Sequence, residues 1–230
     1  MSGSSRADGR TATQLRPMSA SQGVLARADG AVRFGFGDAL AICSVNGPME
    51  AKLKEEQLDR ATIEVQYRPA TGVPGVRARV MEAAIRDIVE ASVLANHHPR
   101  TLVQVTVQHL NEAGSAMATT LNAVAMALLN AGLPLRSMPA TTTCAITADG
   151  ELLIDPTAEE EAVAASIHTM AFVQEQHQLV YIESTGHYTE EQLAACHELC
   201  RAGADKVYAF YRVALEKKLA EEGFVVEAAA

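Results

Sequence analysis

The clearest candidate for chemistry in this 230-residue sequence is a glycine-serine turn, Gly114-Ser115, between a strand-like run and an apolar helix pattern. Backbone N–H groups at a helix N-terminus can hold an anion such as phosphate. Ser115 as an ordinary N-cap would satisfy the same N–H groups without a ligand. The turn therefore predicts either an anion site or a plain helix cap.

The acidic and imidazole side chains are weaker candidates. The run Glu159-Glu160-Glu161 could supply carboxylates for a metal or for general-acid catalysis. Three adjacent Glu more often form a solvated face. His97, His98 and His187 fall in expected loops without a Ser, Cys or Asp partner that the sequence can assign, so no nucleophilic triad is predicted.

The four cysteines predict neither disulfides nor a metal centre. Cys43 and Cys144 lie in strand-like apolar runs, where a reduced Cys packs as a small hydrophobe. Cys196 and Cys200 are four residues apart on a helical pattern beside His197 and could form half a metal site, but no second pair has zinc-like spacing. We expect reduced cysteines, no metal and no other cofactor.

Charge is divided unevenly along the chain. The net charge of −9 argues against a protein that binds nucleic acid on its own, because such binding depends on Lys and Arg side chains that neutralise phosphates. Residues 1–115 carry 13 basic and 12 acidic residues, whereas residues 116–230 carry 6 and 16. The near-neutral first half is therefore the part expected to meet an anionic partner. With neither a signal-peptide pattern nor an apolar run of about 18 residues, we expect a soluble intracellular protein without membrane contact.

Periodic patterns predict the elements that must position these residues. The expected strands are residues 23–28, 31–36, 38–45, 61–67, 101–110, 140–147, 151–154, 166–173 and 178–183, and the expected helices are 76–94, 116–131 and about 189–219. Asp29-Gly30 predicts a hairpin turn, and Thr189 with Gln192 predicts a capping box. Strands followed by a helix recur twice, which indicates an α+β fold. We expect one domain over residues 1–220, with pseudo-repeated halves at about 1–135 and 136–220, and a flexible tail over 221–230.

Motifs spread over roughly residues 6–218 resemble those of the RNase PH family and occur in its order. They are Arg6-Ala-Asp-Gly-Arg10, Gln14-Leu-Arg-Pro17, Gly37-Asp38, Asn46-Gly-Pro48, Glu112-Ala-Gly114-Ser115, Leu121-Asn122-Ala123, Ala127-Leu128-Leu129-Asn130-Ala-Gly-Leu-Pro134, Asp149-Gly150 and Leu153-Ile-Asp-Pro-Thr157 with Glu159 and Glu160. The resemblance implies the RNase PH fold, in which mixed sheets pack against helices.

The resemblance also implies a phosphate site, which this chain matches poorly. Active members shorten RNA from its 3′ end by phosphorolysis and hold phosphate with a Gly-Thr-Arg turn and an Arg from the preceding helix. Here the turn reads Gly114-Ser115-Ala116, so one guanidinium is missing. The helix arginine aligns with Asp87, whose carboxylate would repel phosphate. A shift of one residue would restore Arg86 but not the turn arginine.

The family's carboxylate pair, six residues apart, aligns with Glu160 and Ser166, so only one acid remains. Each lost transition-state donor commonly costs about 2.7–4 kcal/mol. The resemblance therefore implies an RNase PH fold that has lost its catalytic activity.

Within the family, the resemblance is greatest to subunits of the eukaryotic exosome ring. It implies a structural role in a ring of six RNase PH-like chains with RNA-binding cap subunits, in the nucleus, the nucleolus and the cytoplasm. RNA would pass through the central pore to a separate nuclease, during rRNA processing and mRNA decay. Arg77 and Arg79 are candidates for RNA contacts at the pore, although exposed charges on a helix are also common without a ligand. Arg6, Arg10 and Arg16 are expected to fix the N-terminal segment or a neighbouring subunit.

Two alternatives stay open. The chain could be an active phosphate-dependent 3′-to-5′ exoribonuclease that uses Glu160, Asp155 and Arg86 in relaxed positions. It could also be a stand-alone RNA-binding module, but it lacks both the positive charge and the aromatic residues on which single-stranded bases stack.

Overall fold

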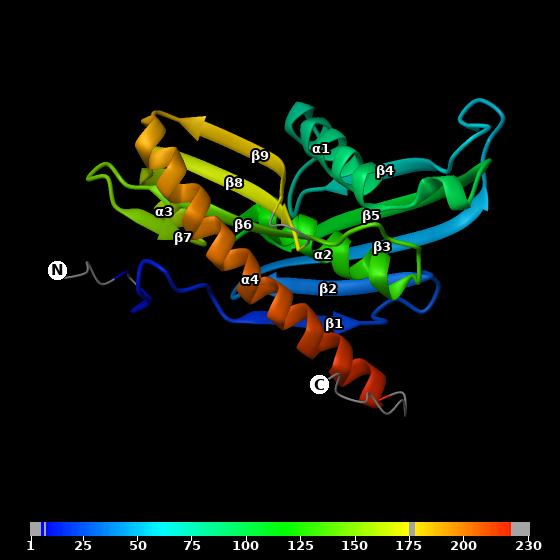
Figure 1. Ribbon diagram of the computed structural model, residues 1–230, viewed down its shortest axis with the longest axis horizontal. Coiled ribbons are helices and arrows are strands. Elements are labelled where there is room, and N and C mark those ends of the chain that lie inside the picture. The colour runs from blue at the N-terminus through cyan, green and yellow to red at the C-terminus, as the bar shows by residue number, and fades with distance from the viewer. Residues whose placement is uncertain (1–5, 7, 175–177, 222–230) are drawn as a thin grey trace.

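The structure is a computed structural model that describes residues 6, 8–174 and 178–221. It is an α+β fold with two β-sheets, as the sequence patterns predict (Figure 1). The elements of the first half are β1 (Met18–Gln22), β2 (Gly30–Phe36), β3 (Ala39–Glu50), β4 (Thr62–Arg68), α1 (Val76–Ser92), the 3-10 helix η1 (Ala95–His97), β5 (Thr101–Asn111) and α2 (Ala116–Asn130). Those of the second half are β6 (Pro139–Ile146), β7 (Leu152–Ile154), α3 (Ala158–Val163), β8 (Ser166–Val173), β9 (Gln178–Gly186) and α4 (Glu190–Glu221).

The five-stranded sheet has the order β1-β2-β3-β5-β4, and the four-stranded sheet has the order β7-β6-β8-β9. Neighbouring strands are antiparallel except β4 and β5, which are parallel and joined through α1. Alternation along β5 buries Val103, Val105 and Val107 against the helices. The second sheet is antiparallel, with β6 paired to both β7 and β8, and β9 forms one of its edges.

Helix α2 lies between the two sheets and forms the centre of the core. Twelve of its 15 residues are buried, which follows from a sequence that is apolar on nearly every side. The polar residues on α2 find partners: Asn122 accepts from the backbone N–H of Thr141 and donates to the carbonyl of the same residue. The first residues of this central helix, and hence the glycine-serine turn, face the second sheet.

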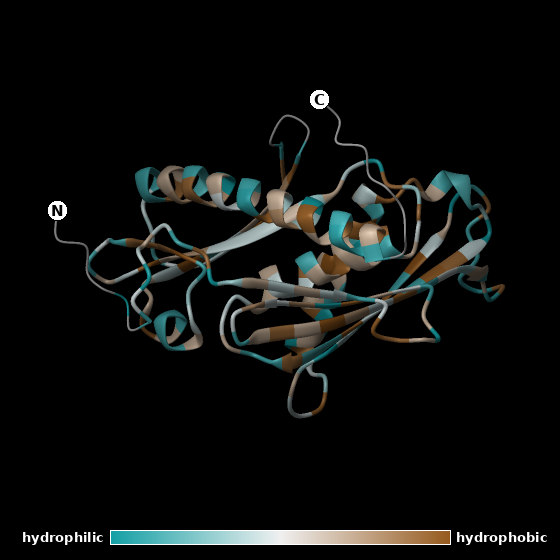
Figure 2. Cartoon of the chain, turned by 90° about the horizontal axis from the view of Figure 1, so that it is seen from below, coloured by the Kyte–Doolittle hydropathy of each residue, from teal (hydrophilic) through white to brown (hydrophobic). Residues whose placement is uncertain are grey.

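Helix α4 runs diagonally across the molecule, packing mainly on the second sheet and also touching β1 of the first (Figure 1). Near the middle of the helix, Gly203 lies so close to Ile154 that a Cβ there would be 2.5 Å from its Cδ1 atom. Further along, Phe210 packs edge-on against Phe34 of β2, with ring centroids 6.0 Å apart. Hydrophilic and hydrophobic residues alternate along α4 (Figure 2), as expected for a helix with one solvated face. The predicted capping box is present between Thr189 and Gln192.

The expected strand at residues 23–28 is wrong. The first strand is β1, which pairs with β2 in a register that sets Met18 opposite Phe36. Gly23 has φ +69° and begins a turn, in which Val24 and Leu25 are exposed. These apolar residues make the segment look strand-like in the sequence. The observed strand β1 has mostly small and polar residues instead.

Two further differences concern the ends of elements. Strand β3 continues beyond residue 45 to Glu50 through an irregularity between Asn46 and Met49. The acidic segment after Asp155 contains the short helix α3, whose capping box joins Thr157 and Glu160. Of the expected tail at 221–230, residue 221 ends α4 and the rest lies outside the described residues.

Among the helices that the structure describes, none is long and apolar enough to cross a membrane.

Candidate functional site: a pocket at the start of helix α2

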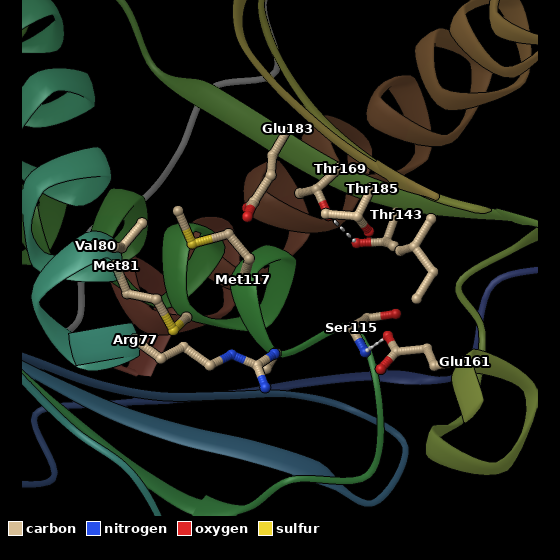
Figure 3. A pocket seen from close by; sticks show the side chains of 12 residues that line it. Arg77, Val80, Met81, Ser115, Met117, Thr143, Glu161, Thr169, Glu183 and Thr185 are labelled. Atoms are coloured by element: carbon tan, nitrogen blue, oxygen red, sulfur yellow. Dashed lines mark hydrogen bonds between the residues drawn. The ribbon is translucent and has the colours of Figure 1, made fainter. Parts of the chain in front are cut away.

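A small pocket of about 150 Å³ lies where the start of α2 meets α1 and the second sheet (Figure 3). Four parts of the chain converge on it. Its lining consists of Arg77, Val80 and Met81 of α1, Ser115, Ala116 and Met117 at the start of α2, Glu161 of α3, and Thr143, Ile167, Thr169, Glu183 and Thr185 of the second sheet. The structure thus brings four residues of the sequence analysis to one place: Arg77, Ser115, Ala116 and Glu161.

The backbone of the glycine-serine turn is held tightly against the segment before α3. Gly114 has φ +90°, and a Cβ there would lie 2.5 Å from the carbonyl oxygen of Pro156 and 2.6 Å from the nitrogen of Ala158. Only glycine fits this position without moving backbone atoms. Ser115 is also left-handed, with φ 53°, and its hydroxyl donates to the Pro156 carbonyl over 3.2 Å.

The N-terminus of α2 is capped by a carboxylate rather than by the serine hydroxyl. Ser115 stands at the N-cap position, but its side chain makes no capping hydrogen bond. Its backbone N–H instead donates to Oε1 of Glu161 over 2.6 Å, a contact drawn in Figure 3. The expectation of an ordinary serine cap is therefore wrong. The group that this helix end binds is thus a carboxyl group of the protein itself.

Opposing influences act on the pKa of Glu161, and the net effect is to raise it. Burial raises the pKa of Glu161, and the Asp155 charge adds to this. The Ser115 N–H and the charges of Arg16 and Arg77 lower it but do not reverse the shift. In Figure 3, Arg77 extends from α1 toward the start of α2. Of the two arginines, Arg16 lowers the pKa of Glu161 more than Arg77 does.

Arg79 is exposed on α1 and is not among the residues that line this pocket. Asp87, also exposed, lies further along the same helix near β9, where its charge adds to the burial that raises the pKa of Tyr181. Neither residue reaches the turn. Arg77 is therefore the one of these two predicted RNA-contact arginines that lines the pocket.

Glu160 and Ser166 face away from the pocket. Arg6 forms an ion pair with Glu160, whose carboxylate also accepts the backbone N–H of Thr157. Burial alone would raise the pKa of Glu160, but these hydrogen bonds and the Arg6 and Arg10 charges lower it overall. Ser166 is buried, with its hydroxyl 3.0 Å from Nε2 of His168. Glu161 and Ile167, which are also six residues apart, line the pocket instead.

The N-terminal arginines fix their own segment to the second half of the chain, as one of the two expectations for them stated. Arg16 binds the carboxylate of Asp155 through both its guanidinium and its backbone N–H, and donates to the Ala113 carbonyl over 2.6 Å. Arg6 and Arg10 donate to the backbone carbonyl of Asp155. Asp155 is 2% exposed, so this ion pair lies in the interior.

In the described part of the chain, the cysteines are buried and His197 packs on an aromatic ring. Cys144 Sγ lies 3.4 Å from Cys196 Sγ in the core, and all four cysteines are free thiols. The ring of His197 packs edge-on against Phe172. Among the residues that the structure describes, no group of three or more His, Cys, Asp or Glu side chains is arranged to hold a metal ion.

Sequence reasoning named Glu161 only as one of three adjacent glutamates and missed its contact with Ser115. It also missed the hydroxyl groups of Thr143, Thr169 and Thr185, which line the pocket. Thr143 and Thr169 are hydrogen-bonded to each other over 3.1 Å across β6 and β8. The available signal was the alternation of β8. Ile167 and Thr169 share one face of this strand, and Ser166 and His168 share the other.

Two sheets that share a central helix, with an anion-binding turn at the start of that helix, define the RNase PH fold. The model of the 3′ exoribonuclease family, domain 1, matches residues 14–134, and that of domain 2 matches residues 137–203. The chain belongs to this family.

Among its relatives, the chain is similar to the exosome complex exonuclease RRP46 homolog of Oryza sativa subsp. japonica. The two are 30% identical over 93% of this chain and 97% of the relative. It is also 32% identical to the exosome complex component rrp46 of Schizosaccharomyces pombe, over 80% of this chain and 83% of the relative. The crystal structure of rice Rrp46 superimposes with a TM-score of 0.87, at 30% identity over 92% of this chain and all of that one. A chain of the Archaeoglobus fulgidus exosome, at 20% identity, shares the fold with a TM-score of 0.78.

Proposed function

We propose that this protein is a non-catalytic subunit of an exosome-type ring, which supports 3′-to-5′ RNA processing and decay while a separate chain cuts the RNA. The observation that carries the proposal is the state of the turn at α2. Ala116 replaces a guanidinium, and the helix end binds the protein's own Glu161. The names of the relatives supply the kind of assembly.

The residues that correspond to the family's carboxylate pair are proposed to be Glu161 and Ile167 rather than Glu160 and Ser166. Glu161 and Ile167 both line the pocket, whereas Glu160 is bound by Arg6 and Ser166 by His168. On either alignment one acid of the pair is absent. Phosphorolysis would then lack both a phosphate-binding arginine and a carboxylate, and each such loss typically costs about 2.7–4 kcal/mol of transition-state stabilisation.

In the proposed ring, residues 1–220 act as one unit, because α4 packs against both sheets. Its partners are other RNase PH-like chains and RNA-binding cap subunits, and the assembly works in the nucleus, the nucleolus and the cytoplasm. Arg77 and Arg79, exposed at the start of α1, are the proposed contacts for RNA phosphates in the shared pore. Two such arginines offer attraction without sequence selection.

The test is purification of the tagged protein from its own cells, followed by native mass measurement. The expected result is an assembly that contains other RNase PH-like chains in a ring of six. Recovery only as a monomer or as a homo-oligomer, with no other RNase PH-like chain, would contradict the proposal.

A second candidate function is an active phosphate-dependent exoribonuclease. It is favoured by one observation, that Arg77 and Glu161 still place a guanidinium and a carboxylate at the start of α2. This candidate requires phosphate to displace Glu161 from the Ser115 N–H. It predicts release of nucleoside diphosphates by the isolated chain.

A further inference from the structure

We propose that Glu161 is a built-in substitute for phosphate: its carboxylate occupies the anion position at the N-terminus of α2 and keeps inorganic phosphate out. The inference rests on the proposed function in one respect, namely that this turn is the one with which active relatives hold phosphate. It gives a non-catalytic role to Glu161, the residue proposed above to correspond to the first acid of the family's carboxylate pair.

The contact itself has the form of a bound anion. The distance from the Ser115 nitrogen to Glu161 Oε1 is 2.6 Å, which is short for an N–H donor and in keeping with a charged acceptor. A helix N-terminus attracts negative charge, and α2 has no acidic residue in its own first turn. The negative charge therefore comes from α3, 46 residues further along the chain.

The carboxylate is held in place by the packing of two elements. Gly114 touches the backbone of residues 156–158, and the hydroxyl of Ser115 donates to the Pro156 carbonyl. Helix α3 begins at Ala158, so Glu161 lies one turn beyond this contact. Because both helix starts are fixed to each other, the Glu161 side chain reaches Ser115 without a flexible loop between them.

The other charges of the pocket discourage a second anion. Glu183 also lines it, so a phosphate would meet two carboxylates and one guanidinium, that of Arg77. The nearby Arg16 is committed to Asp155 and to the carbonyls of the turn. Removing Glu161 would leave a free helix N-terminus beside Arg77, which is a suitable environment for phosphate.

The test compares thermal unfolding of Glu161→Ala with that of wild type in increasing phosphate, against sodium chloride at equal ionic strength. The matched control is Glu159→Ala, an exposed glutamate of the same short helix. We expect the Glu161→Ala protein to unfold at a lower temperature and to regain roughly 2–4 °C when phosphate saturates the freed position. Wild type and Glu159→Ala should show no difference between phosphate and chloride.

Two results would overturn the inference: an equal, saturable response of wild type to phosphate, or a folded Glu161→Ala protein that does not distinguish phosphate from chloride. If Glu161→Ala does not fold, Glu161→Gln decides, since the amide keeps a hydrogen-bond acceptor but loses the charge. A phosphate-specific rise in its unfolding temperature supports the inference, and its absence contradicts it. Native mass measurement of the same variants separates this inference from the ring proposal, because a ring can assemble whether or not Glu161→Ala binds phosphate.

Discussion

At the scale of single residues, Asp155 ties the N-terminal segment to the turn beside the pocket. It is buried with Arg16, and removing one partner of a buried ion pair typically costs about 3–5 kcal/mol. We expect Asp155→Asn, which keeps the shape of the side chain, to lower the free energy of unfolding by about that amount in urea titrations. Glu56→Gln breaks the pair with Arg100, which is 64% exposed, and should cost less than about 1 kcal/mol. Equal effects of the two substitutions would contradict this account of Asp155.

Gly114 belongs to the same scale, because its missing side chain allows the turn to touch the start of α3. Gly114→Ala adds a Cβ within 2.6 Å of three backbone atoms. Gly72→Ala is the matched control, since Gly72 also has positive φ, +86°, but has open space around its Cα. We expect Gly114→Ala to lower the free energy of unfolding by about 1–3 kcal/mol more than the control, measured by urea denaturation. A smaller or equal loss would show that the turn can move away from α3.

At the scale of elements, His168 connects strand β8 to the edge strand β9 of the second sheet. Its ring lies between the hydroxyl of Ser166, in its own strand, and the hydroxyl of Ser184 in β9. Burial lowers the pKa of His168 from 6.5, so the folded protein binds this proton less readily than the unfolded chain. Stability is therefore present above pH 6.5 and falls as the pH decreases below it.

The measurement is the urea midpoint of wild type and of His168→Gln between pH 8 and pH 5. We expect the variant to lose less stability over this range than wild type does. Some dependence should persist, because burial also lowers the pKa of His109. An unchanged slope in the variant would contradict the assignment to His168.

The elements were largely predictable, because α1, β5 and α2 carry periodic apolar residues that match their burial. Strand β1 was not, since its small and polar residues give no such signal and only pairing with β2 selects them. At the candidate site, the proposed carboxylate position, Glu161, differs by one residue from the position that the sequence predicts, Glu160. Glu160 and Glu161 are adjacent in the sequence but have opposite surroundings, and a shift of one residue in β8 exchanges its two faces. Such a choice depends on packing that a single sequence does not contain.

At the scale of the whole molecule, the uneven charge of the two halves of the chain is seen in the lining of the pocket. The acidic second half contributes Glu161 and Glu183 to the lining of the pocket, while the first half contributes Arg77. If Arg77 contacts an RNA phosphate in the assembled ring, Arg77→Ala should weaken RNA binding and lower the salt dependence of the binding constant by about one unit of log-log slope. Arg201→Ala on α4, an exposed arginine paired with Glu198, is the control and should leave both quantities unchanged. An unchanged slope for Arg77→Ala would remove this residue from the RNA path.

The most direct test of the central claim, that this chain has kept the fold but not the chemistry, is phosphorolysis by the purified protein. RNA with a free 3′-hydroxyl is incubated with and without inorganic phosphate, and release of nucleoside diphosphates is measured. The account predicts no phosphate-dependent release, because Ala116 supplies no guanidinium and Glu161 fills the anion position. Phosphate-dependent release of nucleoside diphosphates that disappears in Arg77→Ala would contradict it.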